Sequence, residues 1–429
     1  MFPNPQDALP LPSSPSFEQY RKLAKDLIKA CKSGLPAIAA WTDRWMASLL
    51  AGWDRKSIDR AAHQVEEFAV RTLTREERRC VLADAQFVLA RSHGFMSWSA
   101  FAAHLDALDR TETETAAFEA AAEAVVRGDE STLRELLRQN PELIRTHSAR
   151  EHRATLLHYV SANGVENYRQ KSPRNAARIT ELLLDAGANV EAEANVYGGG
   201  CTALGLVATS TPPREAGVQI PLMRTLLDHG AQIEHPNLAG NNHGAVYACL
   251  AHGCPEAARY LADRGAKLDI VGAAGIGGRD VVEKLFAGAD VETRERALRY
   301  ATGYGQLEVA RYLLDGGVPV DAHSGDGETA LFYAILGDHL EVVRLLLERG
   351  AQPGVRTRYG SVGAAAIWRA AHGGHPDRSA ELLEALIAAG ATFPDRHPAV
   401  NERIDNLLSR YGSQADPSRY WWGEEPRGA

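Results

Sequence analysis

The residues of this chain that are best suited to chemistry lie between positions 158 and 219. They combine a histidine, two tyrosines and an arginine with several side-chain amides: His158, Asn163, Tyr168, Arg169, Gln170, Tyr197 and Gln219. His158 or Tyr168 could act as a general acid or base. Arg169 could hold a carboxylate or a phosphate by two parallel hydrogen bonds. Whether this span is a site depends on how the fold positions these side chains.

Three interpretations of the span remain open. In the first, the residues are structural: His158 forms hydrogen bonds within its own turn, Tyr168 fills a gap, and Arg169 and Lys171 are solvated. In the second, they form a polar pocket for an anionic peptide or small molecule. In the third, His158, Tyr168 and Arg169 are catalytic, although no paired carboxylate at defined spacing and no known nucleophile motif accompanies them.

Other patterns do not indicate a phosphate, metal or cofactor site. The glycines at 198–200 lack the Gly-Lys-Ser/Thr ending of a phosphate loop, and the glycine-rich stretch 272–278 lacks a βαβ setting. His93 and His104 have no Glu or Cys at ligand spacing, so we expect surface or corner histidines. The cysteines are also poorly spaced for zinc. We therefore expect no metal and no cofactor.

Composition limits the class of protein. At 429 residues the chain is too long for one ordinary core, so several domains or a repeat array are expected. A hydrophobic fraction of 45%, a charged fraction of 24% and a net charge of −8 give no reason to expect nucleic-acid binding. No apolar run is long enough to predict a membrane span. Five cysteines, an odd number without a C-x-x-C pair, favour a cytoplasmic location.

A unit at 328–351 recurs in weaker copies along most of the chain. It reads ETALFYAILGDHLEVVRLLLERGA and joins a short helix, a turn at Gly337, a Val- and Leu-rich helix and a closing Gly-Ala. This unit resembles one ankyrin repeat. The closing glycines of the copies are Gly187, Gly230, Gly265, Gly288, Gly317, Gly350 and Gly390, spaced 23 to 43 residues apart against a family period of about 33. The resemblance implies an all-α solenoid of about seven or eight irregular helix-pair repeats, preceded by a small helical domain.

We expect four segments along the chain. Residues 1–15, with five prolines, are predicted to be a disordered leader. Residues 16–110 are predicted to be a helical domain, with capping boxes starting at Ser16 and Thr74 and a core that includes Trp53. Its segment 83–108 resembles the helical region ahead of the repeats in a group of bacterial ankyrin proteins. Residues 116–392 should form the solenoid, and 393–429 a capping helix and tail.

Three insertions interrupt the predicted repeats. They occupy 165–175, 209–219 and 366–379, each in the turn between the two helices of a pair. Because the first two repeats are adjacent, their enlarged turns should project side by side from one edge of the solenoid. Most of the polar residues listed above fall in or beside these two turns.

We predict a non-catalytic interaction module that binds a protein or peptide partner as a monomer. The resemblance implies recognition through hairpin tips and inner helices. The binding residues predicted on this basis are Glu193, Asn195, Tyr197, His235, Asn241, His323, Asp326, Arg356, Arg358 and Tyr359. The alternative is a small-molecule-binding protein or enzyme with its polar site at the enlarged turns between His158 and Gln219.

Overall fold

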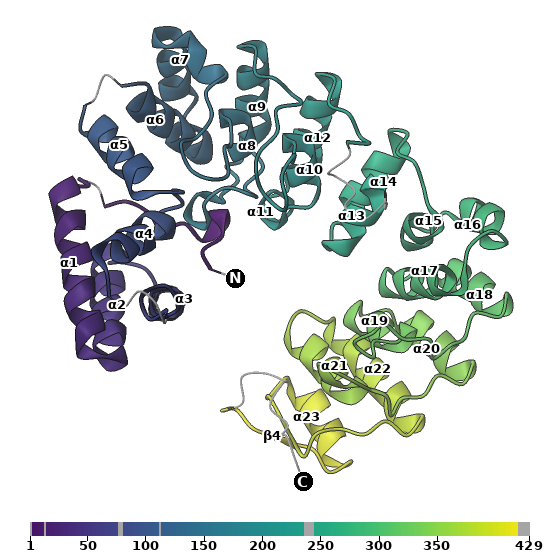
Figure 1. Cartoon of the computed structure of the whole chain (residues 1–429). Coiled ribbons are helices and arrows are strands. Elements are labelled where there is room, and N and C mark those ends of the chain that lie inside the picture. The colour runs from purple at the N-terminus through teal and green to yellow at the C-terminus, as the bar shows by residue number, and fades with distance from the viewer. Residues whose placement is uncertain (1, 13, 76–79, 111–112, 236–243, 419–429) are drawn as a thin grey trace. The chain divides into compact units, whose positions relative to one another are not determined.

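The computed structural model describes residues 2–12, 14–75, 80–110, 113–235 and 244–418 (Figure 1). These residues form an all-α repeat fold, which confirms the predicted fold class. The chain divides into two compact units, Met1–Gly240 and Asn241–Ala429. The division falls inside the segment 116–392 that the sequence predicted as one solenoid.

The first unit begins with a helical region. Its elements are η1 (Pro5–Asp7), α1 (Phe17–Ser33), α2 (Leu35–Leu49), α3 (Arg55–Leu73), α4 (Leu82–Ser92) and α5 (Trp98–Asp109). Trp41, Trp45 and Phe68 are buried in its core, whereas Trp53 is 45% exposed and was wrongly predicted as a core residue. The second capping box was also wrong, since Thr74 ends α3 and α4 begins only at Leu82. The side chain of Ser16 makes no capping bond to α1.

The proline-rich leader is packed against this region rather than disordered. Phe2 lies edge-on to Phe68, and its carbonyl accepts a hydrogen bond of 2.7 Å from Arg71. The Leu9 amide donates to Ser92 O at 2.8 Å, and the Leu9 carbonyl accepts from His93 Nδ1 at 3.1 Å. The composition argument failed here because a few apolar side chains, carried on a backbone that proline already restricts, pack into the core of the helical region.

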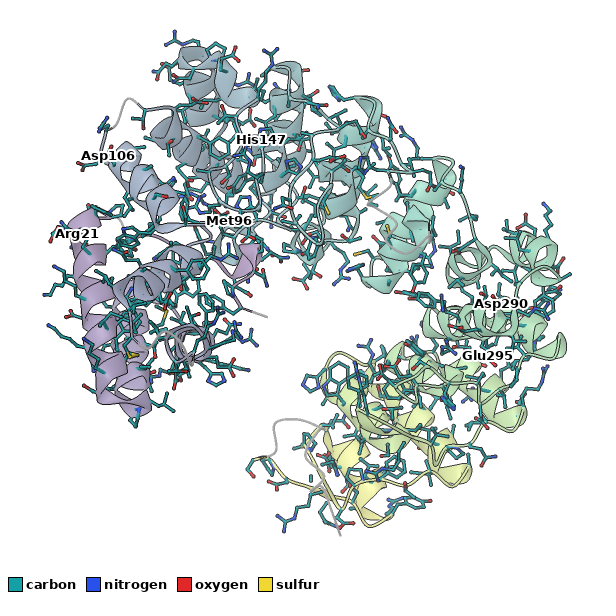
Figure 2. All side chains as sticks on the ribbon, viewed as in Figure 1. Arg21, Met96, Asp106, His147, Asp290 and Glu295 are labelled. Atoms are coloured by element: carbon teal, nitrogen blue, oxygen red, sulfur yellow. A yellow bond between two sulfur atoms is a disulfide. The ribbon has the colours of Figure 1, made fainter. Side chains whose placement is uncertain are left out.

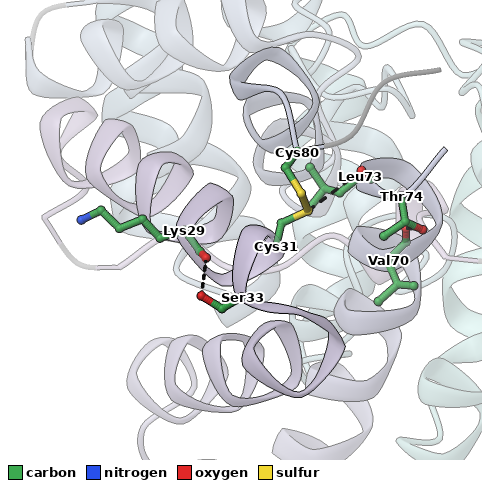
Figure 3. Close-up of a disulfide and its surroundings, with 7 residues drawn as sticks. All are labelled: Lys29, Cys31, Ser33, Val70, Leu73, Thr74 and Cys80. Carbon is green, nitrogen blue, oxygen red and sulfur yellow. Dashed lines mark hydrogen bonds between the residues drawn. A yellow bond between two sulfur atoms is a disulfide. The ribbon is translucent and has the colours of Figure 1, made fainter. Parts of the chain in front are cut away.

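Cys31 and Cys80 form a disulfide between the end of α1 and the segment that follows α3 (Figure 3). The other three cysteines, Cys201, Cys249 and Cys254, are buried free thiols. Disulfides are typical of oxidising compartments. Since one pair does form, the odd number of cysteines was a poor guide to their pairing. The cytoplasmic location stays a prediction. None of the described helices is long and apolar enough to cross a membrane.

Eight helix pairs follow within the described residues, in agreement with the predicted number of repeats. The first unit holds α6 (Glu114–Arg127) with α7 (Glu130–Gln139), α8 (Leu156–Tyr159) with α9 (Ala176–Asp185), and α10 (Ala203–Ala208) with α12 (Gln219–Asp228). The second unit holds α13 (Ala245–Ala251) with α14 (Pro255–Asp263), α15 (Ile270–Ile276) with α16 (Arg279–Phe286), α17 (Val291–Gly303) with α18 (Leu307–Asp315), α19 (Ala330–Leu336) with α20 (Leu340–Glu348), and α21 (Val362–Ala371) with α22 (Pro376–Ala388).

Local capping explains where many of these helices begin and end. Thr329 starts α19 by accepting a hydrogen bond from the Phe332 amide, and Asp290, labelled in Figure 2, starts α17 by accepting one of 2.7 Å from the Thr293 amide. After α20, Gly350 takes φ = +85°, a left-handed conformation that favours glycine. The predicted closing glycine at 288 does not take a positive φ.

Two of the three predicted insertions are enlarged turns. The first contains η3 (Asn167–Arg169) and the second α11 (Thr211–Glu215), whereas a further short helix, η2 (Pro141–Ile144), follows α7. The third insertion is mostly helical, because α21 runs to Ala371 and α22 starts at Pro376. Its alanine-rich sequence favours helix over loop, so the enlarged turn predicted there was wrong.

The second unit packs its helices in two layers. The first helices of successive pairs, α13, α15, α17, α19 and α21, contact one another in order, and we call them the first-helix layer. β1 (Arg356–Thr357) and β2 (Gly360–Ser361) form an antiparallel hairpin before α21. β3 (Arg396–His397) pairs in parallel with β4 (Gln414–Ala415), and α23 (Glu402–Ser409) buries Ile404 and Leu408 in the common core. The predicted C-terminal capping role of this helix is consistent with that burial.

Candidate functional site

His158 is a structural residue of its turn. Its Nδ1 accepts a hydrogen bond of 3.1 Å from the Thr155 amide, so its Nε2 carries the proton and donates to Cys201 O at 3.1 Å. The side chain is fully buried, and burial lowers its pKa to about 4. His158 is therefore neutral and links the start of one repeat to the next.

The other polar residues of the enlarged turns do not converge with it on one point. Asn163 donates to Leu206 O at 3.2 Å and accepts from the exposed Tyr197 hydroxyl at 2.6 Å. Gln170 donates to Val165 O at 2.8 Å. Gln219 is buried and donates to main-chain carbonyls, the shortest bond being 2.9 Å to Val207 O. These amides therefore bind main-chain carbonyls, within the turn for Gln170 and on α10 for Asn163 and Gln219.

Arg169 belongs to a cluster of buried charges, which we define as Glu119, Arg150, Glu166 and Arg169. Arg150 Nη1 lies 2.5 Å from Glu119 Oε1 and 2.9 Å from Glu166 Oε1. Arg169 Nη1 lies 2.8 Å from Glu119 Oε2 and 3.4 Å from Glu166 Oε1. Two guanidinium groups thus balance two carboxylates. Arg169 does hold carboxylates, as its chemistry suggested, but they are internal, and the idea that it is solvated was wrong.

The electrostatics of the buried charge cluster keep all four groups ionised. Burial alone would raise the pKa of Glu119, but the guanidinium groups of Arg150 and Arg169 lower it to about 2. They likewise hold the pKa of Glu166 well below its usual range, against burial. Tyr168 stays protonated, since burial raises its pKa to about 12. These groups form an internal ionic network, without a base of raised pKa that could accept a proton at neutral pH.

The two remaining histidine candidates lie in the core of the helical region. His93 accepts from the Tyr20 hydroxyl at 3.0 Å and stacks on Phe101, and burial lowers its pKa to about 3. His104 is 3% exposed and packs on Phe95, and burial lowers its pKa to about 4. His93 lies at the corner that ends α4, as expected, whereas His104 lies within α5, and neither is at the surface. Across the described ranges, no group of three or more His, Cys, Asp or Glu residues is placed to hold a metal ion.

The predicted binding residues of the first unit lie on two successive loops: Glu193, Asn195 and Tyr197 before α10, and His235 after α12. Tyr197 has φ = +50° and is 63% exposed, next to the glycines at 198–200. Asn195 Nδ2 donates to Glu151 O at 3.1 Å. His235 Nε2 lies 3.4 Å from Glu193 Oε1. The structure therefore presents Tyr197 and pairs Glu193 with His235.

The predicted binding residues of the second unit lie at two neighbouring hairpins. Arg358 pairs with Asp326 at 3.1 Å, and its guanidinium lies 4.5 Å from the ring centroid of Tyr359. Tyr359 also stacks on Phe332 of α19. His323 is exposed and forms a hydrogen bond to Ser324 O, and Arg356 lies in β1. Asp326, Arg358 and Tyr359 are thus brought together, whereas Asn241 lies outside the described residues.

Four tyrosines that the sequence did not single out gather on the first-helix layer of the second unit. They are Tyr247 on α13, Tyr300 and Tyr304 on α17, and Tyr333 on α19, and we call them the tyrosine surface. The rings of Tyr247 and Tyr300 are 5.2 Å apart, and those of Tyr300 and Tyr304 are 6.3 Å apart. All four are half-buried. Burial raises the pKa of Tyr300 and Tyr333, so their phenols remain protonated, and the Tyr333 hydroxyl donates to Glu328 Oε2 at 2.8 Å.

Small residues in α15 allow this contact between α13 and α17. Tyr247 and Tyr300 lie on helices separated in the layer by α15, whose sequence is IVGAAGI. A Cβ at Gly275 would lie 2.5 Å from Leu250 Cδ1, and one at Gly272 would lie 3.3 Å from Val246 Cγ1. The two glycines therefore let α13 approach closely. The Tyr304 hydroxyl then reaches across to donate to Leu250 O.

Arg299 lies beside the tyrosine surface and lacks an ionic partner among the described residues. It is 7% exposed and precedes Tyr300 on α17. Its positive charge lies close enough to Tyr333 to oppose the rise in the Tyr333 pKa that burial causes. Its Nη1 is buried without a hydrogen-bond acceptor, and no described carboxylate forms an ion pair with it. A buried guanidinium without a carboxylate is costly. Arg299 therefore differs from Arg150, which is similarly buried but paired twice.

A His-Asp-Ser network also occurs in the C-terminal cap. His397 Nδ1 lies 2.9 Å from Ser413 Oγ, and its Nε2 lies 3.2 Å from Asp405 Oδ1. These are the residue types of a hydrolase triad, but Ser413 is 1% exposed and His397 is fully buried. The same Asp405 oxygen accepts from the Val400 amide at 3.1 Å. The network fastens α23 to β3 and β4 rather than presenting a nucleophile.

The repeat period was the signal that could have found the tyrosine surface. Tyr300 and Tyr333 are 33 residues apart, one ankyrin period, and therefore occupy equivalent positions in consecutive repeats. Tyr300 and Tyr304 are one helical turn apart on the same face. Nothing in the sequence predicted that Tyr247 would reach them, because that contact depends on the glycines of α15.

Comparison with known proteins locates ankyrin repeats in the second unit. Residues 270–357 match the family described as ankyrin repeats in three copies. The match covers α15 to β1 and includes three of the four residues of the tyrosine surface. Together with the helix pairs, it defines an all-α protein that carries ankyrin repeats.

Individual relatives share only short stretches with the chain. It is 38% identical over 69 residues to "Ankyrin repeat, SAM and basic leucine zipper domain-containing protein 1" of Ovis aries and of Bos taurus, covering 16% of this chain and 14% of each relative. It is 25% identical over 142 residues to "Ankyrin repeat and KH domain-containing protein mask-1" of Caenorhabditis elegans, covering 31% of this chain and 5% of the relative. These animal proteins lend no support to the bacterial resemblance.

Proposed function

We propose that this chain is a non-catalytic interaction module that binds a protein or peptide partner through the tyrosine surface and the adjoining hairpins of the second unit. The observation that carries the proposal is the gathering of four half-buried tyrosines from three helices beside Arg299, which pairs with no described carboxylate. Tyrosine and arginine are the residues most enriched at energetically dominant points of protein interfaces. Ankyrin repeats in general mediate contacts between proteins, which is consistent with this proposal.

Charge indicates the chemistry of the partner. Arg299 Nη1 has no acceptor among the described residues, whereas the Tyr333 hydroxyl already donates to Glu328 Oε2 at 2.8 Å. A carboxylate on the partner would receive a charge-assisted hydrogen bond from the guanidinium of Arg299. We therefore expect a peptide segment that places Asp or Glu at Arg299 and packs apolar groups on the rings.

The alternative of an enzyme or small-molecule site at the enlarged turns gains no support from the contacts. His158 and Gln219 bond to the backbone, and Arg169 is neutralised by Glu119 and Glu166. No set of these side chains is left to bind a ligand together. Catalytic roles for His158, Tyr168 and Arg169 therefore form no part of the proposal.

Selection from a displayed library of random peptides on the immobilised full chain tests the proposal. We expect enriched peptides that bind wild type and lose affinity with Tyr300→Ala/Tyr333→Ala, by about thirtyfold if each tyrosine contributes about 1 kcal/mol. The matched control is Tyr260→Ala/Tyr312→Ala, which alters half-buried tyrosines of α14 and α18, outside the first-helix layer. Equal losses in both double variants would contradict the assignment.

The hairpins need a separate variant set. Alanine at Arg356 and Tyr359 removes the side chains next to α19, and alanine at Tyr197 removes the exposed ring of the first unit. We expect weaker binding from the first two changes. Unaltered binding with all three would show that the hairpins take no part, and would leave the tyrosine surface alone as the proposed interface.

A further inference from the structure

A groove runs between α1 and α2, in the helical region and away from the repeats. It has a volume of 870 Å³ and is bordered at one end by the leader residues Pro12 and Ser14. Its remaining lining comes from the two helices: Gln19, Tyr20, Lys22, Leu23, Asp26, Lys29, Ala30 and Ser33 of α1, and Ala37, Ala40, Trp41, Arg44, Trp45, Ser48 and Leu49 of α2.

The floor of the groove is apolar and its rim is basic. Trp41 and Trp45 are almost fully buried, and Leu23 and Leu49 are half-buried along the walls. The lining carries three basic side chains and one acidic one. Of these, Lys29 pairs with Asp26 at 3.4 Å, whereas Lys22 and Arg44 form no ion pair with a described residue.

The charge of α1 sets it apart from the rest of the chain. The helix carries five basic residues against two acidic ones, although the whole chain has a net charge of −8. Arg21, labelled on α1 in Figure 2, is paired with Glu18 outside the groove lining. The local excess of positive charge therefore borders the groove, where it complements an acidic surface.

We infer that this groove docks an acidic amphipathic helix of a partner protein. The lining of α1 extends from residue 19 to residue 33, about 21 Å at 1.5 Å per residue, which matches a helix of about four turns. Aliphatic anchors of the ligand at i, i+3 and i+7 would lie on the tryptophan floor. Its Asp and Glu residues would meet Lys22, Lys29 and Arg44.

The shape and packing of α1 favour a helix over a membrane surface. A basic helix that binds anionic lipid must offer its apolar face to the bilayer. The apolar face of α1 is occupied, since Tyr20, Ala24, Leu27 and Cys31 are buried in the core. The groove that remains open lies between two helices, so it fits a helix rather than a flat bilayer surface.

A displayed library of 16-residue helical peptides, selected on the full chain, tests this inference. Peptides that lose affinity with Tyr300→Ala/Tyr333→Ala report on the other surface and are set aside, so the two proposals fail independently. Among the rest, we expect acidic peptides whose affinity, measured by fluorescence anisotropy, falls at least tenfold with Lys22→Glu/Lys29→Glu. The matched control is Lys25→Glu/Lys32→Glu, with the same charge change on exposed residues of the same helix outside the lining.

A steric variant separates contact from long-range attraction. Ala40→Trp should fill the groove and weaken binding, whereas Ala47→Trp changes an exposed alanine of α2 outside the lining and should not. Equal losses in the two charge-reversal variants, or no effect of Ala40→Trp, would overturn the inference. It would also be overturned if no peptide depended on Lys22 and Lys29 while phosphatidylserine vesicles bound through them.

Discussion

Arg299 and Arg150 give a paired test of how buried charge acts in this fold, because replacing each by methionine should change stability in opposite directions. Both side chains are more than nine-tenths buried. Arg150 lies 2.5 Å from Glu119 and 2.9 Å from Glu166, whereas Arg299 has no carboxylate partner among the described residues. Methionine keeps much of the apolar stem of arginine and removes the charge.

The magnitudes follow from the partners that each change leaves behind. Arg150→Met leaves Arg169 as the one guanidinium among the described residues that pairs with both Glu119 and Glu166, and breaking a buried ionic group in this way costs about 3–5 kcal/mol. Arg299→Met leaves no charge unpaired and removes the desolvation cost of a guanidinium. We expect it to stabilise the second unit by about 1–4 kcal/mol, the range seen when buried ionic groups are replaced by apolar ones.

Hydrogen exchange followed by mass spectrometry is the appropriate assay, since a chain with two compact units has no single well-defined melting temperature. Protection of 291–303 should rise in Arg299→Met, and protection of 156–169 should fall in Arg150→Met. Arg296→Met is the control on α17, because Arg296 is 25% exposed and pairs with Glu292 at 2.7 Å, so its loss should cost no more than about 1 kcal/mol. Lower protection of 291–303 in Arg299→Met would refute the reasoning. It would show that the guanidinium stabilises α17 through a contact other than an ion pair.

Three further predictions concern stability. Burial lowers the pKa of His93 to about 3 and of His158 to about 4, from 6.5, so the unfolded first unit binds more protons than the folded one below pH 6.5. The free energy of unfolding of the first unit, measured from its own transition in urea, should therefore fall by up to about 1.4 kcal/mol per pH unit per histidine as the pH drops from 6.5 to 4. The slope should be shallower in His158→Gln. Cys31→Ser opens a disulfide that spans 49 residues and should cost about 2–4 kcal/mol in the same assay, while reduction should not affect it further. Gly275→Val should cost about 1–3 kcal/mol and weaken peptide binding to the tyrosine surface, because its side chain meets Leu250; a neutral effect would contradict the close packing.

Much of the repeat architecture could be predicted from local signals. Thr329 and Gly350 mark a start and an end of helices in the regular unit, and a 33-residue period fixes the order in which pairs stack. These signals depend on a few neighbouring residues, so they can be identified in a single sequence. Where the local signal was ambiguous, as at Thr74 and in the alanine-rich stretch 366–379, the boundary was wrong.

The leader and the disulfide could not be predicted because both depend on distant contacts. Phe2 packs on Phe68, far along the chain. Cys31 pairs with Cys80 across a separation of 49 residues. Proline content describes how a segment behaves in isolation, without the helices against which this one packs. The pairing of an odd set of cysteines likewise depends on which two the fold brings together.

Arg169 and Arg299 show why residue type alone was a poor guide to the site. Arg169 attracted attention because polar residues surround it in the sequence, and the fold supplies both of its carboxylates from within. Arg299 lies in an ordinary helix, yet it retains hydrogen-bonding capacity that no described residue meets. Buried polar groups in folded proteins are almost always satisfied. A buried guanidinium that pairs with no described carboxylate is therefore the stronger indication of a contact that forms only with a partner. Arg299→Met should separate the two roles by raising stability while it weakens binding.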